Sequence, residues 1–240
     1  MAEGMEMTPF ILVLVFGFVS GMRHALDPDH IAAVSTIVAE HQNIWRSSRI
    51  GAFWGVGHAG MLAAAGIGVL VFKIAIPEGL ATALELAVGA MLVILGGHVL
   101  WCVVRDRFHI HVHEHEGERH IHWHSHRHGP DHRHEHGRRP EYRSLLVGMI
   151  HGLAGSAPLT LLVLSSMRSL VGGLFYLAMF GIGSIAGMVI VSTLIGSSFA
   201  YTGRRFERAN LALRLLAGLA SLGIGGAILY EMGFRSGRAM

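Results

Sequence analysis

The sequence predicts an all-α integral membrane protein with six transmembrane helices. Its 240 residues are 52% hydrophobic and 15% charged, and the mean hydropathy is +0.49. Several apolar runs reach the ~20 residues that a helix needs to cross the hydrocarbon core of a bilayer. A low aromatic content of 8% and the lack of alternating polar and apolar segments argue against a membrane β-barrel. The lipid bilayer is therefore the expected environment.

The expected spans follow one another along the chain. The first, residues 9–39, is longer than one straight crossing requires. Pro28 disfavours helical geometry at Asp27, so we expect this helix to be broken or kinked there. Gly155 and Pro158 indicate an interruption in the fourth span as well. The second to sixth spans are expected at residues 50–76, 80–104, 144–167, 170–201 and 211–234.

A polar loop, residues 105–143, separates the third span from the fourth. Its histidines are interspersed with Glu, Arg and Gly, a composition that does not build a core, so we expect a disordered, solvated loop with many weak metal ligands. We interpret this His-rich loop as a buffer or sensor for metal ions; the alternative is a linker whose histidines are incidental. The twelve histidines are His109, His111, His113, His115, His120, His122, His124, His126, His128, His132, His134 and His136.

The two halves on either side of the loop match each other at an offset of about 127 residues. Residues 21–26 (GMRHAL) align with 148–153 (GMIHGL), 54–58 (WGVGH) with 180–184 (FGIGS), and 96–101 (GGHVLW) with 225–230 (GGAILY). A repeat of three spans places its copies in opposite orientations, which is the plan of many secondary transporters. We therefore expect an inverted repeat, with a first three-helix repeat at 1–104, the His-rich loop at 105–143 and a second three-helix repeat at 144–240.

The basic residues predict the orientation in the membrane. Fourteen arginines lie on the side that holds the first–second, third–fourth and fifth–sixth connections, against four lysines or arginines on the other side. Cytoplasmic flanks carry the excess of positive charge, so the His-rich loop is expected in the cytoplasm and both termini outside. We expect a bacterial cytoplasmic (inner) membrane. This placement of arginine accounts for the pI of 9.5 without a nucleic-acid partner.

Ionisable side chains gather in the first expected span, where residues 23–30 read RHALDPDH. An Asp or Arg at the centre of a membrane helix costs roughly 2.5–3.5 kcal/mol on insertion scales, so such residues indicate function. Imidazole and carboxylate suit first-row divalent ions, and imidazole favours Ni, Cu, Zn and Co over Mg or Ca. The predicted metal ligands are His24, Asp27, Asp29, His30 and, from the second span, His58.

The spacing of these residues constrains how the motif folds. On a regular helix His24 and His30 point about 120° apart, so they can share one ion only if the backbone unwinds between them. Arg23 is expected to balance the carboxylates when no ion is bound. The alternative is an Arg23–Asp27 ion pair with histidines that only cap the helix. Weaker candidates are His98, near the cytoplasmic end of the third span, and His151, which matches His24 in the repeat.

Several of these segments resemble a known family. Residues 23–32 (RHALDPDHIA) closely resemble the His-x4-Asp-His motif of the nickel/cobalt transporter family, and residues 57–58 resemble the Gly-His of its following helix. Residues 151–157 (HGLAGSA) are similar to the second motif of its compact, urease-accessory-type branch. The resemblance covers all six spans. It implies Ni²⁺ or Co²⁺ translocation, with His24, Asp29 and His30 in the essential motif.

The chain also departs from that family's pattern. It lacks the extra helices of the eight-span members, and its long His-rich insert is similar to the related efflux branch, which leaves the direction of transport open. We expect a transporter of divalent nickel or cobalt, with the ion as cargo and no cofactor. One alternative is an exporter of zinc or of divalent metals more broadly. The other is a membrane accessory protein that hands nickel to metalloenzyme maturation proteins without net flux. No His-Glu-x-x-His sequence occurs, so we expect no metalloprotease and no enzyme.

Overall fold

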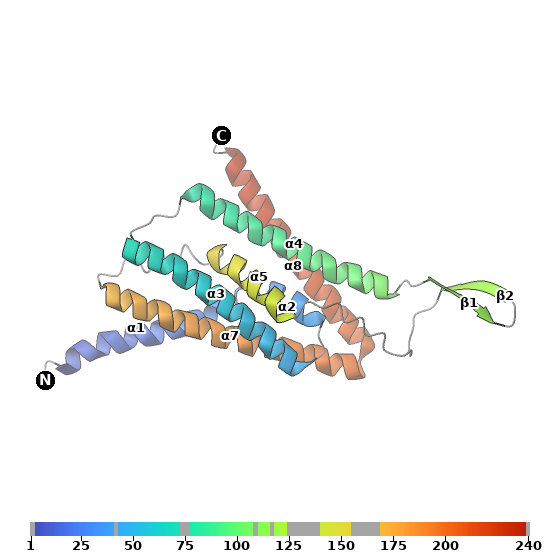
Figure 1. Ribbon diagram of the computed structural model, residues 1–240, viewed down its shortest axis with the longest axis horizontal. Helices are drawn as coiled ribbons and strands as arrows, with labels where there is room; N and C mark the ends of the chain where they lie inside the picture. The colour runs from blue at the N-terminus through green and yellow to red at the C-terminus, as the bar shows by residue number, and fades with distance from the viewer. Residues whose placement is uncertain are drawn as a thin grey trace.

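The computed structural model describes residues 3–40, 43–72, 77–107, 110–115, 118–123, 140–154 and 169–238, and within these ranges it contains seven helices and one two-stranded sheet (Figure 1). The helices are α1 (Glu3–His24), α2 (Pro28–Ala39), α3 (Ile44–Phe72), α4 (Glu78–Arg107), α5 (Pro140–Ala154), α7 (Leu170–Arg205) and α8 (Glu207–Arg238). The strands β1 (Ile110–His115) and β2 (Glu118–Trp123) lie between α4 and α5 in the sequence.

Four of these helices, α3, α4, α7 and α8, are long and apolar enough to cross a membrane. The helices α1 and α2 pass the same test only as a pair, bent by 55°, which gives up to five spans in the described part of the chain. The fourth expected span begins in α5 and continues into residues 155–168, which lie outside the described residues together with the interruption expected there. The architecture is that of a helical membrane protein.

The break between α1 and α2 falls where Pro28 was expected to place it. Pro28 is the first residue of α2, a position at which its missing N–H costs no hydrogen bond. Asp27 has the extended backbone that a residue before proline favours, with φ −60° and ψ 141°. The N–H groups of Leu26 and Asp27 donate to the carbonyls of Arg23 and His24, at 2.9 and 3.1 Å. These bonds close the turn, and the chain leaves it in a new direction.

Helix α2 occupies the middle of the bundle (Figure 1). It contacts α4, α7 and α8, and eight of its twelve residues are buried. Twelve residues rise only about 18 Å, which is less than the ~30 Å hydrocarbon core. Around it, Ile50, Trp54, Leu92 and Met188 form one hydrophobic core with its Val38. The short helix therefore carries its first turn deep into the protein.

Glycines allow the longer helices to approach closely. Helix α3 packs along α5 and α7, α1 packs along α7, and α4 packs along α8. A methyl group at Gly21 would collide with the carbonyl oxygen of Phe180, and one at Gly148 with that of Trp54. Such backbone crossings over small residues are typical of membrane helix packing.

Part of the His-rich loop is ordered as a β-hairpin, so the expectation of a wholly disordered loop is wrong for these residues. Strands β1 and β2 pair antiparallel, with Ile110 opposite Trp123 and His113 opposite His120. The sequence of β1, IHVHEH, alternates histidine with other residues at the period of two that favours a strand. In Figure 1 the hairpin stands apart from the helices, beyond the end of α4.

Candidate metal centre

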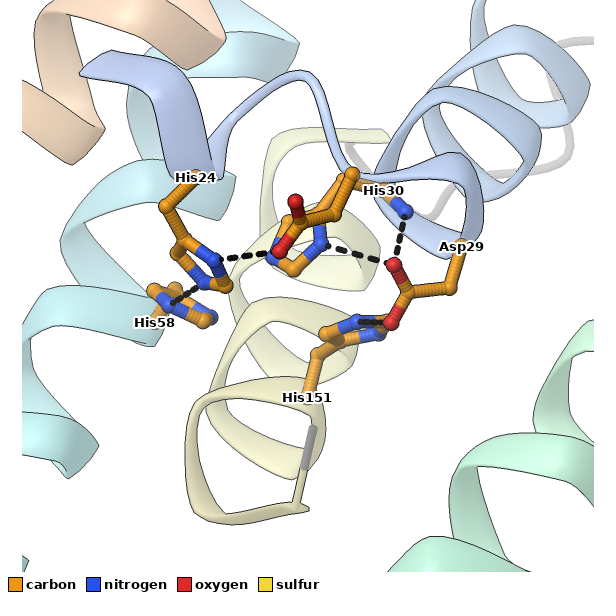
Figure 2. A network of polar contacts seen from close by, with 6 residues as sticks. His24, Asp29, His30, His58 and His151 are labelled. Carbon is orange, nitrogen blue, oxygen red and sulfur yellow. Dashed lines mark hydrogen bonds and ion pairs between the residues drawn. The ribbon is translucent and has the colours of Figure 1, made fainter. Parts of the chain in front are cut away.

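Four buried histidines meet at the break between α1 and α2. His24 is the last residue of α1, His30 lies in the first turn of α2, His58 is on α3 and His151 is on α5. Their exposed fractions are 6%, 1%, 0% and 0%. Figure 2 shows the four rings and the Asp29 carboxylate pointing toward one another. Three separate parts of the chain thus supply one cluster.

The rings are close enough to share an ion. The His30 ring centroid lies 4.4 Å from that of His24, 5.0 Å from that of His58 and 4.2 Å from that of His151. Two groups each bring donor atoms within 4.8 Å of one another: His24, His30 and His58 form the first, and Asp29, His30 and His151 form the second. A tetrahedral ion with nitrogen ligands at about 2.0–2.1 Å needs these atoms about 3.3 Å apart, so small side-chain adjustments suffice.

The two aspartates orient the histidine rings. Asp27 Oδ2 lies 2.7 Å from His24 Nδ1. Asp29 contacts two rings, with Oδ1 3.2 Å from His30 Nδ1 and Oδ2 2.8 Å from His151 Nε2. Because a carboxylate only accepts, a neutral ring donates from the contacted nitrogen and keeps the lone pair on the other one. Carboxylate–histidine pairs of this kind commonly support the histidine ligands of metal sites.

Three ring nitrogens at this cluster are buried and have no hydrogen-bond partner among the described residues: His30 Nε2, His58 Nδ1 and His151 Nδ1. An unpaired buried polar atom costs about 1–3 kcal/mol. In His30 and His151 this is the nitrogen that keeps the lone pair when the other ring nitrogen donates to Asp29. The remaining close pair is His24 Nε2 and His58 Nε2, 3.0 Å apart. The donor set therefore fits a divalent ion that accepts nitrogen ligands.

The predicted site residues do not all occupy the same position. The structure brings His24, His30 and His58 together, and it places Asp29 beside them with its side chain 20% exposed. Asp27 lies at the rim, with 46% exposure, in contact with His24. Arg23 is exposed, and the alternative of an Arg23–Asp27 ion pair is not seen among the described residues, because the turn folds Asp27 back onto His24.

His151 was only a weak candidate in the sequence, and the structure places it in the cluster. Its match with His24 in the repeat was the signal that pointed to it. His98 lies elsewhere, where its Nδ1 is 2.9 Å from Glu40 Oε1. Aromatic rings border the cluster: Trp54 is 5.8 Å from His151, and Phe180 is 5.6 Å from His24, between ring centroids. Apolar walls of this kind limit the access of water to the donor atoms.

The fold and this cluster define a helical integral membrane protein with a buried site suited to a divalent transition-metal ion. Residues 10–232 match the family described as high-affinity nickel-transport protein (NicO), and the chain belongs to this family. It is a family of transport proteins rather than enzymes, and it implies a metal ion as substrate. The chain is also 35% identical to the urease accessory protein UreH of Bacillus sp. (strain TB-90) over 233 residues, which is 97% of each chain.

More distant similarity extends to plants. The proteins named Chloroplast protein FOR GROWTH AND FERTILITY 2 and 1, from Arabidopsis thaliana, are 25% and 26% identical over 241 and 211 residues. These matches cover 91% and 87% of this chain but 56% of each relative, so the chain spans about half the length of the plant proteins. No solved structure matches the chain.

Proposed function

We propose that this protein moves Ni²⁺ or Co²⁺ across the membrane through the histidine cluster at the break between α1 and α2. The observation that carries this proposal is the convergence of His24, His30 and His58 in a member of a nickel-transport family, with nitrogens of His30 and His58 that have no partner among the described residues. Neutral imidazole favours these ions over Mg²⁺ or Ca²⁺. The ion is cargo, and the proposal needs no resident cofactor.

In this proposal His24, His30 and His58 bind the ion, while Asp27 and Asp29 keep the rings in the binding tautomer. Asp29, His30 and His151 form the adjoining group, so His30 belongs to both. An ion held by His30 can therefore take His151 as a further ligand and release one of the others, while Asp29 continues to orient both rings. Such stepwise exchange suits a site that must both load and release its cargo.

We further propose that the protein is a six-span inverted repeat. Three pairs of close contacts at glycines support it. Gly21 meets Phe180 as Gly148 meets Trp54, Gly57 meets Leu145 as Gly183 meets Phe18, and Gly96 meets Gly218 as Gly225 meets Gly89. In each pair the second contact joins the repeat equivalents of the first, with the two halves exchanged. The packing of α1 on α7 and of α5 on α3 is reciprocal in the same way. Such reciprocity is what a two-fold axis between the halves produces.

An inverted repeat gives the site a way to face both sides of the membrane. In transporters with this plan the substrate site lies near the midplane between two halves that rock about it. The cluster fits this plan, because His24, His30 and His58 come from the first half and His151 from the second. We propose a bacterial inner membrane as the location, and the arginine bias supports a cytoplasmic His-rich loop.

The test is a flux assay with purified protein in sealed vesicles that contain a metal-sensitive dye. Ni²⁺, Co²⁺ or Zn²⁺ is added outside under imposed proton, sodium or voltage gradients. Ni²⁺ or Co²⁺ should enter faster than in protein-free vesicles, and His30→Ala should abolish the difference. His41→Ala, in the first expected connection, is the matched control and should transport normally. Flux that is unchanged in His30→Ala would remove the cluster from the pathway.

A second candidate function is nickel delivery without transport, which is favoured by the similarity to the urease accessory protein UreH. A membrane accessory protein of this kind would bind nickel and pass it to metalloenzyme maturation proteins. The same vesicles distinguish the two functions, because stoichiometric Ni²⁺ binding with no flux under any gradient would select delivery. Flux that strongly prefers Zn²⁺ would instead select the alternative of a broader divalent exporter.

A further inference from the structure

A second group of metal-type side chains lies beside the first turn of α5, where the chain returns to the helices after the His-rich loop. His98 and Cys102 are on α4, and Glu40 follows the last residue of α2. Cys102 Sγ lies 3.9 Å from His98 Nδ1 and 4.0 Å from His98 Nε2. The Nδ1 atom of the same imidazole also meets Glu40, with 2.9 Å between Nδ1 and Oε1. None of these residues belongs to the cluster of His24, His30, His58 and His151, which is called the central cluster below.

The carboxylate of Glu40 sets the tautomer of His98. It accepts from Nδ1–H of a neutral ring, so the lone pair remains on Nε2, one of the two nitrogens near the cysteine sulfur. Asp27 orients His24 in the same manner at the central cluster. Arg143 Nη1, from the first turn of α5, lies 3.8 Å from Glu40 Oε2 and helps to hold the carboxylate in place.

The spacing of His98 and Cys102 suits a shared ligand. Residues four apart on a helix lie on the same face, so both side chains reach the same point. Across a tetrahedral ion, with a sulfur at about 2.3 Å and a nitrogen at about 2.0–2.1 Å, the two atoms lie roughly 3.5 Å apart. The sulfur is now about equally far from both ring nitrogens, at 3.9 and 4.0 Å, so a rotation of the Cys102 side chain toward Nε2 would bring the two atoms to this separation. The His98 side chain is 42% exposed, so the surrounding protein does not enclose the ring.

We propose that Cys102 and His98 form a second metal-binding site, with Glu40 as the residue that positions the imidazole. A thiolate and an imidazole select Ni²⁺, Co²⁺ or Zn²⁺ over Mg²⁺ and Ca²⁺. Two protein ligands leave coordination positions open to exchange, as a transfer site requires. The site lies at one end of α2, and His30 lies in the first turn at the other end, so it stands between the His-rich loop and the central cluster.

Cobalt absorption tests this site alone. Cys102 is the single cysteine of the chain, so a thiolate-to-cobalt charge-transfer band in the near ultraviolet reports this residue, whatever the histidines bind. Co²⁺ titration of the purified full-length protein should give a saturable band that is lost in Cys102→Ser. His98→Ala should weaken the Co²⁺ affinity read from the band by at least about tenfold. Glu40→Ala should weaken it by about 10–100-fold, as loss of an orienting carboxylate does, and Glu40→Gln should restore most of it, because its amide oxygen still accepts from Nδ1–H.

A second readout does not depend on substitution of the cysteine. Ni²⁺ should slow the alkylation of Cys102 by a maleimide in the wild-type protein and should not slow it in His98→Ala. His30→Ala separates this proposal from the transport proposal, since it should abolish flux and keep the charge-transfer band. Absence of the band when Co²⁺ saturates the protein's histidines, or a band and protection unchanged in His98→Ala, would overturn the second site.

Discussion

Asp29 holds two histidines at once. Its Oδ1 accepts from the backbone N–H of His30 at 3.0 Å and contacts the ring of the same residue, while its Oδ2 contacts His151. Asp27 contacts one ring and is more exposed. The two aspartates of the motif are therefore unequal, although both were predicted as ligands. At the level of single residues, the carboxylate that fixes two rings should have the greater effect on binding.

Asp29→Asn should lower Ni²⁺ affinity by about 10–100-fold, the usual effect of losing an orienting carboxylate, because the amide keeps one acceptor oxygen and can accept from only one of the two rings. Asp27→Asn should have the smaller effect. Quenching of Trp54 fluorescence by Ni²⁺ measures the affinity, because this ring lies 6.3 Å from that of His30. The protein used would carry phenylalanine at the other three tryptophans, Trp45, Trp101 and Trp123.

The comparison of Asp29→Asn with Asp27→Asn has an internal control. His98 lies outside the central cluster, so His98→Ala should leave the quenching of Trp54 by Ni²⁺ unchanged. Equal affinities of Asp29→Asn and the wild-type protein would show that Asp29 does not support the ligands. A larger loss in Asp27→Asn than in Asp29→Asn would reverse the order that the contacts predict.

The motif identified most of the cluster from sequence because its residues are adjacent in the chain. His24, Asp29 and His30 needed only the break at Pro28 to come together. His151 could not be assigned with the same strength, since it reaches the cluster through the packing of α5 on α3. That packing depends on Gly152, where a methyl group would collide with the carbonyl of His58. Hydrophobic patterns locate helices, but they do not state which helices touch.

At the level of elements, the sequence located the helices better than their ends. The second span was predicted from residue 50, yet α3 begins at Ile44. Asn43 accounts for the earlier start, because its side-chain Oδ1 accepts from the N–H of Arg46 at 3.1 Å and caps the helix. The apolar run marks only the part of a helix that meets lipid. The polar first turn of α3 depends on this cap.

Gly96→Ala should destabilise the pairing of α4 with α8. A methyl group there would lie 2.6 Å from the carbonyl oxygen of Gly218 and 2.9 Å from the backbone N of Leu222. Overpacking of this kind costs typically about 1–3 kcal/mol. Thermal unfolding in detergent, followed by circular dichroism, should show a lower midpoint than that of the wild-type protein.

The adjacent residue supplies the matched control. A methyl group at Gly97 meets nothing within 4 Å among the described residues. Replacing glycine by alanine inside a helix is favourable by roughly 0.5–1 kcal/mol, so Gly97→Ala should keep or raise the midpoint. If the two variants unfold at the same temperature, the close crossing at Gly96 does not contribute to stability.

At the level of the whole molecule, the sequence offered two global patterns. Three segments that match in order predict the repeat, and the concentration of arginines on one side predicts the orientation. The hairpin in the His-rich loop was not predicted, because the polar composition of the loop indicates disorder and only the alternation of histidine at a period of two favours strands. The pairing of helices across the two halves was not predictable, since it depends on which glycines face which backbones.

The orientation is tested by labelling with an impermeant maleimide on intact cells. In a Cys102→Ser background, Ser125→Cys lies in the His-rich loop and should react only after the cells are permeabilised, because that side is expected to be cytoplasmic. Ala239→Cys, near the expected external C-terminus, should react without permeabilisation. The opposite pattern, with Ser125→Cys labelled on intact cells, would invert the assignment.

The reciprocal packing of the helices also has a consequence for assembly. Helix α1 packs on α7, α3 packs on α5 and α7, and α4 packs on α8, so the largest contacts all join the half before the loop to the half after it. The buried surfaces of one half are therefore covered mainly by the other. We therefore expect that the two proposed repeats, residues 1–104 and 144–240, do not form independent folding units. During synthesis, the surfaces that the first half presents to the second stay uncovered by protein until the second half is inserted, as in one isolated subunit of an obligate heterodimer.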